Sequence, residues 1–466
     1  GGDSPAALYV NDSAAAGALS FVARPSATTD LGAVVGAYPV DIDGDDKPDL
    51  VVLRHGENVI LRGSGECTFE RANEEWGFDG GNDWSTAFSA KWDYGASWPT
   101  IAIGNYLSPE NPNGSRDCVD NRLFQPAPAG SGFGPPTVLT PSWCTLSLLF
   151  TDWDRSGRRD LRVSNDRHYY SDLSGGQEQL WRVAPRETPR QYTAADGWKT
   201  VKIWGMGIGD YDVNGDGYPD YYLTSQGDNK LQILAAGPEQ PSYQDVALKL
   251  QVNATRPYAG DTNLPSTGWH SEFQDVNNDG LVDLYVSKGN VDQIPDYAMA
   301  DPSDLMLGQQ DGTFDEVGTP AGIDAMDKAR GGAVVDLNDD GLLDLVIVDR
   351  VSNVRVYRNV GSGTPDAPRQ MGNWIALELG DDGSNRDSIG AWIEVQTDAG
   401  IQQRELTIGG GHASGELVPV HFGLGQSGTA QVRITWPDAT QGDWQQVTGN
   451  HTYVIARNVA PVQVDQ

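Results

Sequence analysis

The sequence predicts an all-β protein: a calcium-binding β-propeller of about seven blades, with six as the alternative, followed by a small C-terminal domain like a β-sandwich. Three observations predict this architecture. Acidic loops recur along most of the chain, each followed by a short apolar run. Glycine (56 residues) and proline (27) are frequent and hydrophobic residues make up only 38% of the 466 positions, as in chains of many short strands joined by turns. Near the C-terminus, apolar and polar residues alternate with the period of a strand.

Five acidic loops carry oxygen-bearing side chains at loop positions 1, 3, 5 and 9. They begin at residues 41, 152, 212, 275 and 336, so the last four are 60, 63 and 61 residues apart. The four positions are occupied by Asp41, Asp43, Asp45 and Asp49; Asp152, Asp154, Ser156 and Asp160; Asp212, Asn214, Asp216 and Asp220; Asp275, Asn277, Asp279 and Asp283; and Asp336, Asn338, Asp340 and Asp344. The first interval, 111 residues, has room for one more unit, and Trp98–Tyr106 looks like a unit whose acidic loop has decayed. This spacing indicates an internal repeat.

The residue types in these loops suit calcium, which takes six to eight oxygens from carboxylates, amides, carbonyls and water. Alternate residues of a tight loop can point inward together, and position 9 closes the cage from the start of the next strand. Glycine at position 6 of three loops (Gly217, Gly280 and Gly341) permits the turn that sends the chain back. Magnesium fits less well because it demands strict octahedral geometry. We therefore expect about five Ca²⁺ sites.

The acidic loops have two other interpretations, a different kind of calcium site and a turn without metal. The helix–loop–helix calcium site needs a glutamate at position 12, and the residues there are apolar: Val52, Val163, Leu223, Val286 and Ile347. The loops could instead be turns capped by their own Asp and Asn side chains, without metal. Repeated clusters of unpaired like charge favour a cation. The loop at Asp152 fits least well, because Ser156 is a weaker ligand and three arginines (Arg155, Arg158 and Arg159) lie beside it.

Further strand-like segments follow the loops, and they give the blade count. They are Ile60–Gly63 with Phe69, Asn121–Phe124 with Phe133, Gln179–Trp181 with Tyr192, Leu231–Leu234 with Tyr243, Leu305–Leu307 with Phe314, and Val354–Tyr357. Leu8–Asn11 with Phe21 forms a similar pair without a preceding acidic loop, and we expect it to complete the blade that closes the ring. Such units bury their apolar faces only by stacking. The propeller is expected to span residues 1–365.

Residues 371–460 form the second predicted domain. Ile375, Leu377 and Leu379 would share one face of a strand, with Glu378 on the other. The boundary lies near Gly361–Pro365, a stretch of linker composition. We expect a close backbone approach at the three consecutive glycines, 409–411.

The net charge of the protein and the first residues of the chain bear on its binding partners and its cellular location. The net charge is 32 − 65 = −33, which makes nucleic acid an unexpected partner. The sequence has no apolar run of about 18 residues that would span a membrane. The start Gly1-Gly2-Asp3-Ser4 predicts a mature product without its export signal, and a glycine-rich start is also found behind a lipid-modified cysteine. We expect a secreted, periplasmic or cell-surface protein, of undetermined oligomeric state.

The three cysteines allow at most one disulfide. Cys118 and Cys144 would enclose a Pro- and Gly-rich excursion, so we favour that pair and expect Cys67 to be free. The alternative is three buried thiols.

The sequence contains no strong catalytic motif. The six histidines (His55, His168, His270, His412, His421 and His451) show no metal-binding spacing, and Gly-x-Ser-x-Gly does not occur. His168 and His270 could face the propeller channel, but structural roles are more common. Trp204 and Trp269, just upstream of acidic loops, fit core packing. Glycosylation sequons occur at Asn11, Asn113, Asn253 and Asn450.

The loops resemble the FG-GAP/VCBS repeats of integrin α-like propellers. The tail motifs are similar to the ASPIC/UnbV domain of the cartilage acidic protein family and its bacterial homologues; they are Gly383–Ala391, Gly409–Ser414, His421–Gly425 and Ile434–Asp438. The resemblance implies a secreted calcium-binding propeller with a C-terminal β-domain. The chain lacks the Cys-rich module of the animal members and an Arg-Gly-Asp tripeptide, which favours a bacterial-type homologue.

Two functions follow as hypotheses. The favoured one is a non-catalytic interaction, adhesion or assembly protein with a protein or surface-polysaccharide partner. The alternative is a carbohydrate-active enzyme, a lyase or dehydratase, with its site in the propeller channel.

Overall fold

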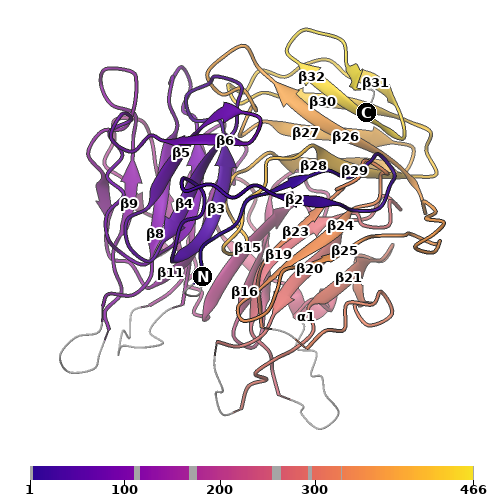
Figure 1. Ribbon diagram of the computed structural model, residues 1–466, viewed down its shortest axis with the longest axis horizontal. Helices are drawn as coiled ribbons and strands as arrows, with labels where there is room; N and C mark the ends of the chain where they lie inside the picture. The colour runs from indigo at the N-terminus through magenta and orange to yellow at the C-terminus, as the bar shows by residue number, and fades with distance from the viewer. Residues whose placement is uncertain are drawn as a thin grey trace.

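The computed structural model describes residues 4–109, 116–166, 176–253, 264–291, 296–326 and 328–464. His168 and Asn113 therefore lie outside the described residues. The described chain is almost entirely β-structure (Figure 1), with one 3-10 turn, η1 (Ala194–Asp196), and one short helix, α1 (Ala247–Leu250). No helix in these ranges has the length and apolar character needed to cross a membrane.

Six antiparallel sheets follow one another along residues 34–357. We call them together the ring. The first sheet contains β3 (Val34–Val40), β4 (Asp49–Arg54), β5 (Val59–Gly65) and β6 (Thr68–Arg71). The second contains β7 (Ser85–Lys91), β8 (Thr100–Asn105), β9 (Asn121–Phe124) and β10 (Thr137–Leu139). The third contains β11 (Thr145–Thr151), β12 (Asp160–Asn165), β13 (Gln179–Arg182) and β14 (Arg190–Gln191). The fourth contains β15 (Gly205–Tyr211), β16 (Asp220–Ser225), β17 (Lys230–Leu234) and β18 (Tyr243–Asp245). The fifth contains β19 (Gly268–Gln274), β20 (Asp283–Lys288), β21 (Asp304–Gly308) and β22 (Phe314–Glu316), and the sixth β23 (Ala329–Val335), β24 (Asp344–Asp349) and β25 (Arg355–Tyr357).

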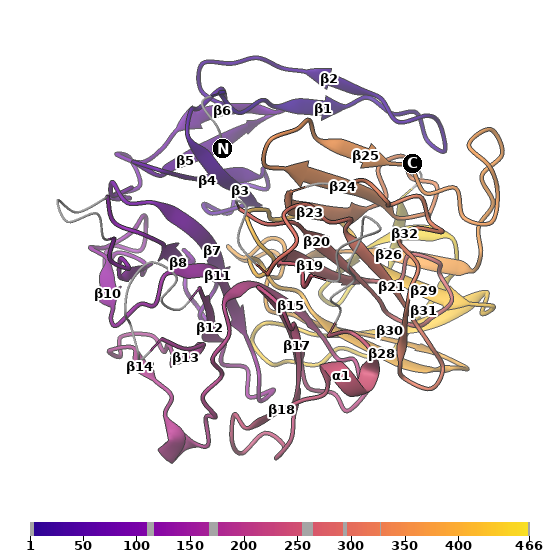
Figure 2. The ribbon, with the colours of Figure 1, turned by 90° about the horizontal axis from the view of Figure 1, so that it is seen from below.

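The six sheets are arranged around a common axis, as in a propeller (Figure 2). The first strand of each sheet lies innermost and packs against the first strand of the next, from β3 against β7 to β19 against β23. Each of these inner strands has one register shift near its start where it pairs with the second strand, which marks the six sheets as copies of one unit. Strands β11 and β12 are buried along their whole length because neighbouring sheets cover both of their faces.

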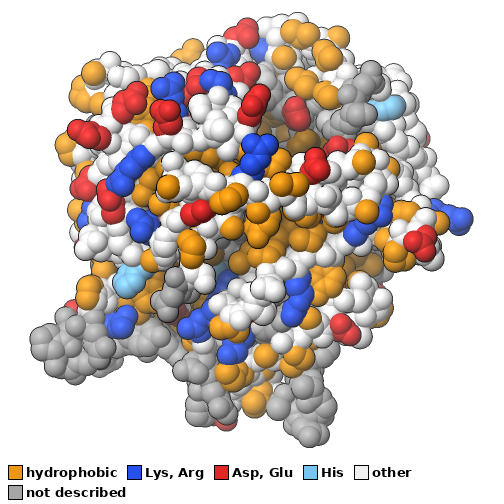
Figure 3. Space-filling model, in the orientation of Figure 1, with side chains coloured by type: hydrophobic (Ala, Val, Ile, Leu, Met, Phe, Trp, Pro, Cys, Tyr) orange, Lys and Arg blue, Asp and Glu red, His pale blue; other side chains and the backbone are white. Residues whose placement is uncertain are grey.

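The expected count of seven blades is wrong for the described residues, where six sheets make up the ring. The N-terminal pair, β1 (Tyr9–Asn11) and β2 (Phe21–Ala23), forms a separate two-stranded sheet. The chain passes from Ala23 to β3 within a short connection, so no inner strands exist between them to complete a seventh blade. The hairpin instead contacts the last acidic loop, where the Ala16 N–H donates to Asn338 O (2.6 Å). Figure 3 shows hydrophobic side chains exposed on this side of the molecule, and Tyr9 of the hairpin is 60% exposed.

The decayed unit predicted at Trp98–Tyr106 corresponds to the second sheet, in which β8 follows the connection 92–99. Aromatic packing takes the place of the acidic cluster there. Trp98 packs edge-on against Trp76, with ring centroids 5.1 Å apart, and both side chains belong to a buried aromatic and aliphatic cluster.

Residues 373–464, here called the tail, form two four-stranded sheets packed face to face. One contains β29 (Val420–Gly425), β26 (Asn373–Gly380), β32 (His451–Ala456) and β33 (Val462–Val464). The other contains β28 (Gly400–Glu405), β27 (Trp392–Thr397), β30 (Thr429–Thr435) and β31 (Gln445–Thr448). Ile375, Leu377 and Leu379 point into the core between them and Glu378 points out, as the alternation predicts.

A disulfide joins Cys118 to Cys144, with Cα atoms 4.6 Å apart. It connects the segment before β9 to the residue before β11, and so links the second and third sheets. Cys67 is a free thiol on the surface.

Candidate functional site

Each acidic loop joins the inner strand of a sheet to its second strand. The carboxylate at position 1 folds the loop by accepting backbone hydrogen bonds. Asp212 Oδ1 accepts from the Asp216 N–H (3.0 Å) and Oδ2 from the Gly217 N–H (2.9 Å). Asp41, Asp275 and Asp336 do the same in their loops, and Asp152 accepts one such bond, from Gly157. The position-1 residue is therefore a structural cap of the loop, whether or not a cation binds.

The aspartate at position 9 is fully buried in all five loops (Asp49, Asp160, Asp220, Asp283 and Asp344). In the fourth loop, Asp283 accepts hydrogen bonds from the Val276 N–H within the loop and from the Gly308 N–H of the third strand, each 2.9 Å long. The carboxylate thus ties the loop to its own sheet. Each of its oxygens has a second lone pair and remains able to bind a cation.

The first loop has the most compact carboxylate cluster. Asp41, Asp43 and Asp49 can each offer an oxygen within 4.8 Å of the others, the only such group of three metal-ligating side chains in the described part of the chain. Arg62 approaches the same cluster, with Nη2 2.8 Å from Asp43 Oδ2. In the third, fourth and fifth loops the position-3 asparagine donates to the position-5 aspartate, as from Asn214 Nδ2 to Asp216 Oδ2 (2.9 Å).

The loops differ in how their charge is neutralised. Arg158 pairs with Asp160 (Nε–Oδ1 3.2 Å) and Asp154 (Nη2–Oδ2 3.4 Å), so the second loop carries its own cation. Arg358 pairs with Asp340 in the fifth loop (3.4 Å). Among the residues that the structure describes, no lysine or arginine pairs with the carboxylates of the third and fourth loops. These two loops have the greatest need of an external cation.

The pKa values of these carboxylates reflect that need. Burial raises the pKa of Asp212 to about 6. Burial, with Asp212 and Asp216 adding like charge, raises the pKa of Asp220 to about 8. In the fourth loop, burial and the charge of Asp279 raise the pKa of Asp275 to about 7. Carboxylates in this setting take up either a proton or a cation near neutral pH, and an all-oxygen donor set suits a hard divalent cation.

All five acidic loops lie on the face of the ring against which the tail packs. In the first loop, Gly44 O accepts a hydrogen bond from Arg386 Nε (3.1 Å). In the fourth, Asn278 Oδ1 is 2.6 Å from His421 Nε2. The third and fifth loops approach the tail through their position-6 glycines. A Cβ on Gly217 would lie 3.6 Å from the Gln403 side chain, and one on Gly341 would overlap the Trp374 ring.

The second loop makes the most extensive contact with the tail, through Glu405 at the end of β28. The Glu405 carboxylate accepts hydrogen bonds from the Asp152 N–H and the Thr151 hydroxyl (each 2.9 Å), and Arg159 Nε lies 3.4 Å away. Arg155 stacks over the Trp392 ring, 3.9 Å from its centroid. Burial raises the pKa of Glu405 to about 8, against the opposing charge of Arg159. The three arginines of this loop therefore serve the loop itself and the tail interface.

The tail also enters the centre of the ring, through residues 408–416, here called the plug. Backbone N–H groups of Gly410 and Gly411 donate to Leu148 O (2.7 Å) and Ile208 O (2.6 Å), on inner strands of two sheets. Ser89 Oγ, on a third inner strand, donates to Ile408 O (2.6 Å). The glycines are required here: Gly409 has φ of +110° and a Cβ on it would overlap Phe88 O. The expected close backbone approach is thus a contact with the ring.

The plug also spans the ends of the ring, between β3 of the first sheet and β23 of the last. A Cβ on Gly36 would lie 3.2 Å from the Ala413 backbone, and one on Gly331 would lie 3.5 Å from the Ser414 side chain. Figure 2 shows the yellow and orange chain of the tail reaching the axis between the inner strands. The plug therefore contacts both the first and the last sheet of the ring.

His412 and His270 meet at the plug. His412 Nδ1 is 3.2 Å from Leu146 O, its ring packs against Trp269 (centroids 4.9 Å apart), and burial lowers its pKa to about 3. His270 Nδ1 is 3.0 Å from the Ser414 hydroxyl. His270 does face the axis, as considered from the sequence, but it faces the plug. Trp269 lies in a buried cluster, as does the partly buried Trp204, in agreement with a packing role.

Sequence reasoning missed Glu405 and the plug contacts of His412. Glu405 is the one buried residue of the strand Gly400–Glu405, whose other residues are exposed or half-buried. No local sequence pattern therefore indicates that Glu405 is buried. The glycine triplet was the available signal, but its partners lie hundreds of residues earlier in the chain.

Comparison with known families bears on the tail. Residues 381–462 match the family described as ASPIC and UnbV. The match supports the resemblance stated for this part of the chain, whereas the resemblance of the ring to FG-GAP/VCBS repeats stays a prediction. Comparison with curated proteins gives no match.

Solved structures that match the chain include an Agrocybe aegerita lectin that recognises non-reducing terminal N-acetylglucosamine (16% identity, 76% of this chain and 90% of that chain, TM-score 0.39). Another is PorZ, a surface component of the type-IX secretion system of Porphyromonas gingivalis (11% identity, 96% and 58% covered, TM-score 0.41). A third is a GH43 protein from Bacillus licheniformis (12% identity, 90% and 89% covered, TM-score 0.32). At these TM-scores the likenesses carry no inference about binding or activity.

Proposed function

We propose that this chain is a non-catalytic, calcium-stabilised interaction protein, secreted or held at the cell surface. The observation that carries the proposal is the plug. A propeller enzyme places its reacting groups along the central axis, and here Ile408, Gly410 and Gly411 are hydrogen-bonded to inner strands at that place. The axis is used to join the tail to the ring, which leaves the outer surfaces for a partner, a protein or a surface polysaccharide.

Calcium would act at the junction of the two predicted domains, residues 1–365 and 371–460. The third and fourth loops are the strongest candidates, because their buried carboxylates have no ion-paired cation among the described residues. The first and fifth loops offer similar donors, but cations already pair with them: Arg62 and Lys47 in the first loop (Lys47 Nζ–Asp45 Oδ2 3.1 Å) and Arg358 in the fifth. In the second loop Arg158 already supplies the positive charge. We therefore expect about four ions, each holding a loop that touches the tail, so that calcium stabilises the sheet and the interface together.

The carbohydrate-active alternative makes a different prediction about the axis. The acidic group best placed for it is Glu272 on β19, but its carboxylate already accepts from the Val334 N–H (3.0 Å) and from Gln274 Nε2 (2.7 Å). A carboxylate held in this way supports packing of the inner strands. We therefore assign Glu272 to the packing of the inner strands, and the assay below tests whether it also acts as a general acid or base.

Paired assays separate the two functions. The protein is immobilised at millimolar Ca²⁺ and exposed to surface polysaccharides and to the surface-protein fraction of its source, while the same polysaccharides are assayed for turnover. We expect calcium-dependent capture of a partner and no turnover. Turnover that Glu272→Gln abolishes, in a variant whose melting temperature is unchanged, would contradict the non-catalytic function.

A further inference from the structure

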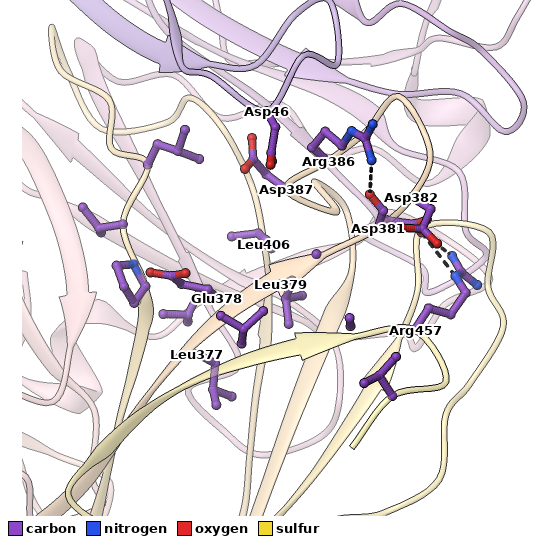
Figure 4. Close-up of a pocket in the computed structure, with 18 residues that line it drawn as sticks. Asp46, Leu377, Glu378, Leu379, Asp381, Asp382, Arg386, Asp387, Leu406 and Arg457 are labelled. Carbon is purple, nitrogen blue, oxygen red and sulfur yellow. Dashed lines mark hydrogen bonds and ion pairs between the residues drawn. The ribbon is translucent and has the colours of Figure 1, made fainter. Parts of the chain in front are cut away.

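A cavity opens away from the axis, between the tail and the first acidic loop of the ring (Figure 4). Its volume is about 520 Å³, within the range of sites that bind small molecules. Residues of β26 and β32 line it, together with residues 417–420, which follow the plug. Asp46 of the ring closes one side. None of the contacts between the acidic loops and the tail described above fills this space.

The wall of the cavity carries an excess of negative charge. Five acidic residues line it, against two arginines. Both arginines are engaged: Arg457 pairs with Asp381 (2.8 Å), and Arg386 donates to backbone carbonyls. Among the residues that the structure describes, no lysine or arginine pairs with the other four carboxylates, which belong to Asp46, Glu378, Asp382 and Asp387. The cavity is therefore prepared for a cation.

The positions of the acids favour more than one positive charge on the ligand. In Figure 4, Asp46 and Asp387 lie next to each other on one side of the cavity and Glu378 lies across from them. Asp46 comes from the ring, and Asp387 and Glu378 come from the tail. A ligand that reaches both sides would contact both parts of the protein.

The floor between these acids is aliphatic. Leu406 lies between Glu378 and the pair formed by Asp46 and Asp387, together with the end of Leu379, whose side chain otherwise packs in the core between the tail sheets. Val418 and Val454 also line the cavity. Among the described residues, no aromatic side chain lines the cavity, so this part of the chain offers no flat surface on which a sugar ring stacks. Methylene groups suit such a floor, because their burial is favourable and needs no hydrogen-bond partner.

We propose that this cavity binds a linear aliphatic polyamine. Its ammonium groups contact Asp46 and Asp387 on one side and Glu378 on the other, and the methylene segments lie over Leu379 and Leu406. A single metal ion would leave the aliphatic floor unused, and a neutral alkyl chain would leave the carboxylates unpaired. None of the three acids occupies loop position 1, 3, 5 or 9, but Asp46 belongs to the first acidic loop, where its N–H donates to Asp41 Oδ2 (2.9 Å). Polyamine binding is therefore measured with that loop saturated with Ca²⁺.

Isothermal titration of the full chain with spermidine tests the proposal, at saturating Ca²⁺ and about 0.15 M salt, where long-range attraction between charges is screened. We expect saturable one-to-one binding, weaker binding of putrescine, and none of neutral 1,8-octanediol. Glu378 is exposed and Glu378→Gln should fold normally. Loss of one charge-assisted contact should weaken spermidine binding about tenfold.

Two further variants locate the site. Glu239→Gln makes the same change at an exposed residue outside the cavity and should leave the affinity unchanged. Gly380 lines the cavity and a Cβ on it would meet nothing within 4 Å, so Gly380→Leu should fold, keep every charge and obstruct binding. Equal weakening by Glu378→Gln and Glu239→Gln would reduce the effect to general attraction and overturn the proposal. So would the absence of saturable heat, or stoichiometric displacement of spermidine by added Ca²⁺.

Discussion

Substitution of Gly409 by alanine is the sharpest perturbation of the junction between ring and tail. Gly409 has φ of +110°, and a Cβ there would overlap Phe88 O and lie 2.8 Å from Leu148 O. Holding alanine in a sparsely populated backbone region costs about 1–3 kcal/mol, and overpacking a filled site costs about 1–3 kcal/mol more. The lower conformational entropy of the unfolded Gly409→Ala variant offsets up to about 1 kcal/mol of this loss. Gly409→Ala should therefore lower the free energy of unfolding by about 1–6 kcal/mol.

Urea unfolding, followed by tryptophan fluorescence at fixed Ca²⁺, measures this loss. Hydrogen exchange should show the largest gain in the plug and in the inner strands β7 and β11 that it contacts. Gly428→Ala is the matched control in the same domain, because a Cβ there meets nothing within 4 Å, and its urea midpoint should equal or slightly exceed that of the wild type. Equal midpoints for Gly409→Ala and Gly428→Ala would refute the conclusion that the plug fixes the tail in the ring.

Three further predictions follow from the same contacts. Asp279→Ala should remove one bound Ca²⁺ from the full chain in native mass spectrometry, while Asp154→Ala should leave the ion count unchanged because the second loop has its own arginine. Burial lowers the pKa of His412 to about 3, so below about pH 6.5 the unfolded chain binds a proton at this residue that the folded chain does not; the contribution of His412 to the free energy of unfolding should fall by about 2 kcal/mol between pH 7 and pH 5. His412→Gln should lose this component of the urea-midpoint pH profile, and an unchanged profile would contradict it. Replacing Cys118 and Cys144 by serine opens a loop of sequence separation 26 and should lower stability by about 3.5 kcal/mol in urea, with no difference once the wild type is reduced.

The repeat was predictable because its signal is local. The spacing of acidic and apolar residues predicted a loop between two strands, and β15 and β16 flank Asp212–Asp220 as expected. The alternation around Leu377 likewise predicted the tail strand and its buried face. In each case the residues that decide the structure lie within about ten positions of one another.

The blade count and the junction depend on contacts that no local pattern reports. The N-terminal hairpin looks like the outer half of a blade, but only the tertiary structure shows that no inner strands accompany it. The glycine triplet predicted a close approach without its partner, because Gly410 bonds to Leu148 and Gly411 to Ile208. The neutralising role of Arg158 was visible only as proximity in sequence, which suggested interference with a metal and not an ion pair.

We propose that cations bound in the acidic loops hold the ring and the tail together. The direct test counts the ions carried by the full chain after equilibration with millimolar Ca²⁺ and follows its melting temperature as Ca²⁺ is withdrawn. We expect about four bound ions and a melting temperature that rises with the concentration of free Ca²⁺. A chain that binds no Ca²⁺ under these conditions and melts at the same temperature with and without chelator would contradict it.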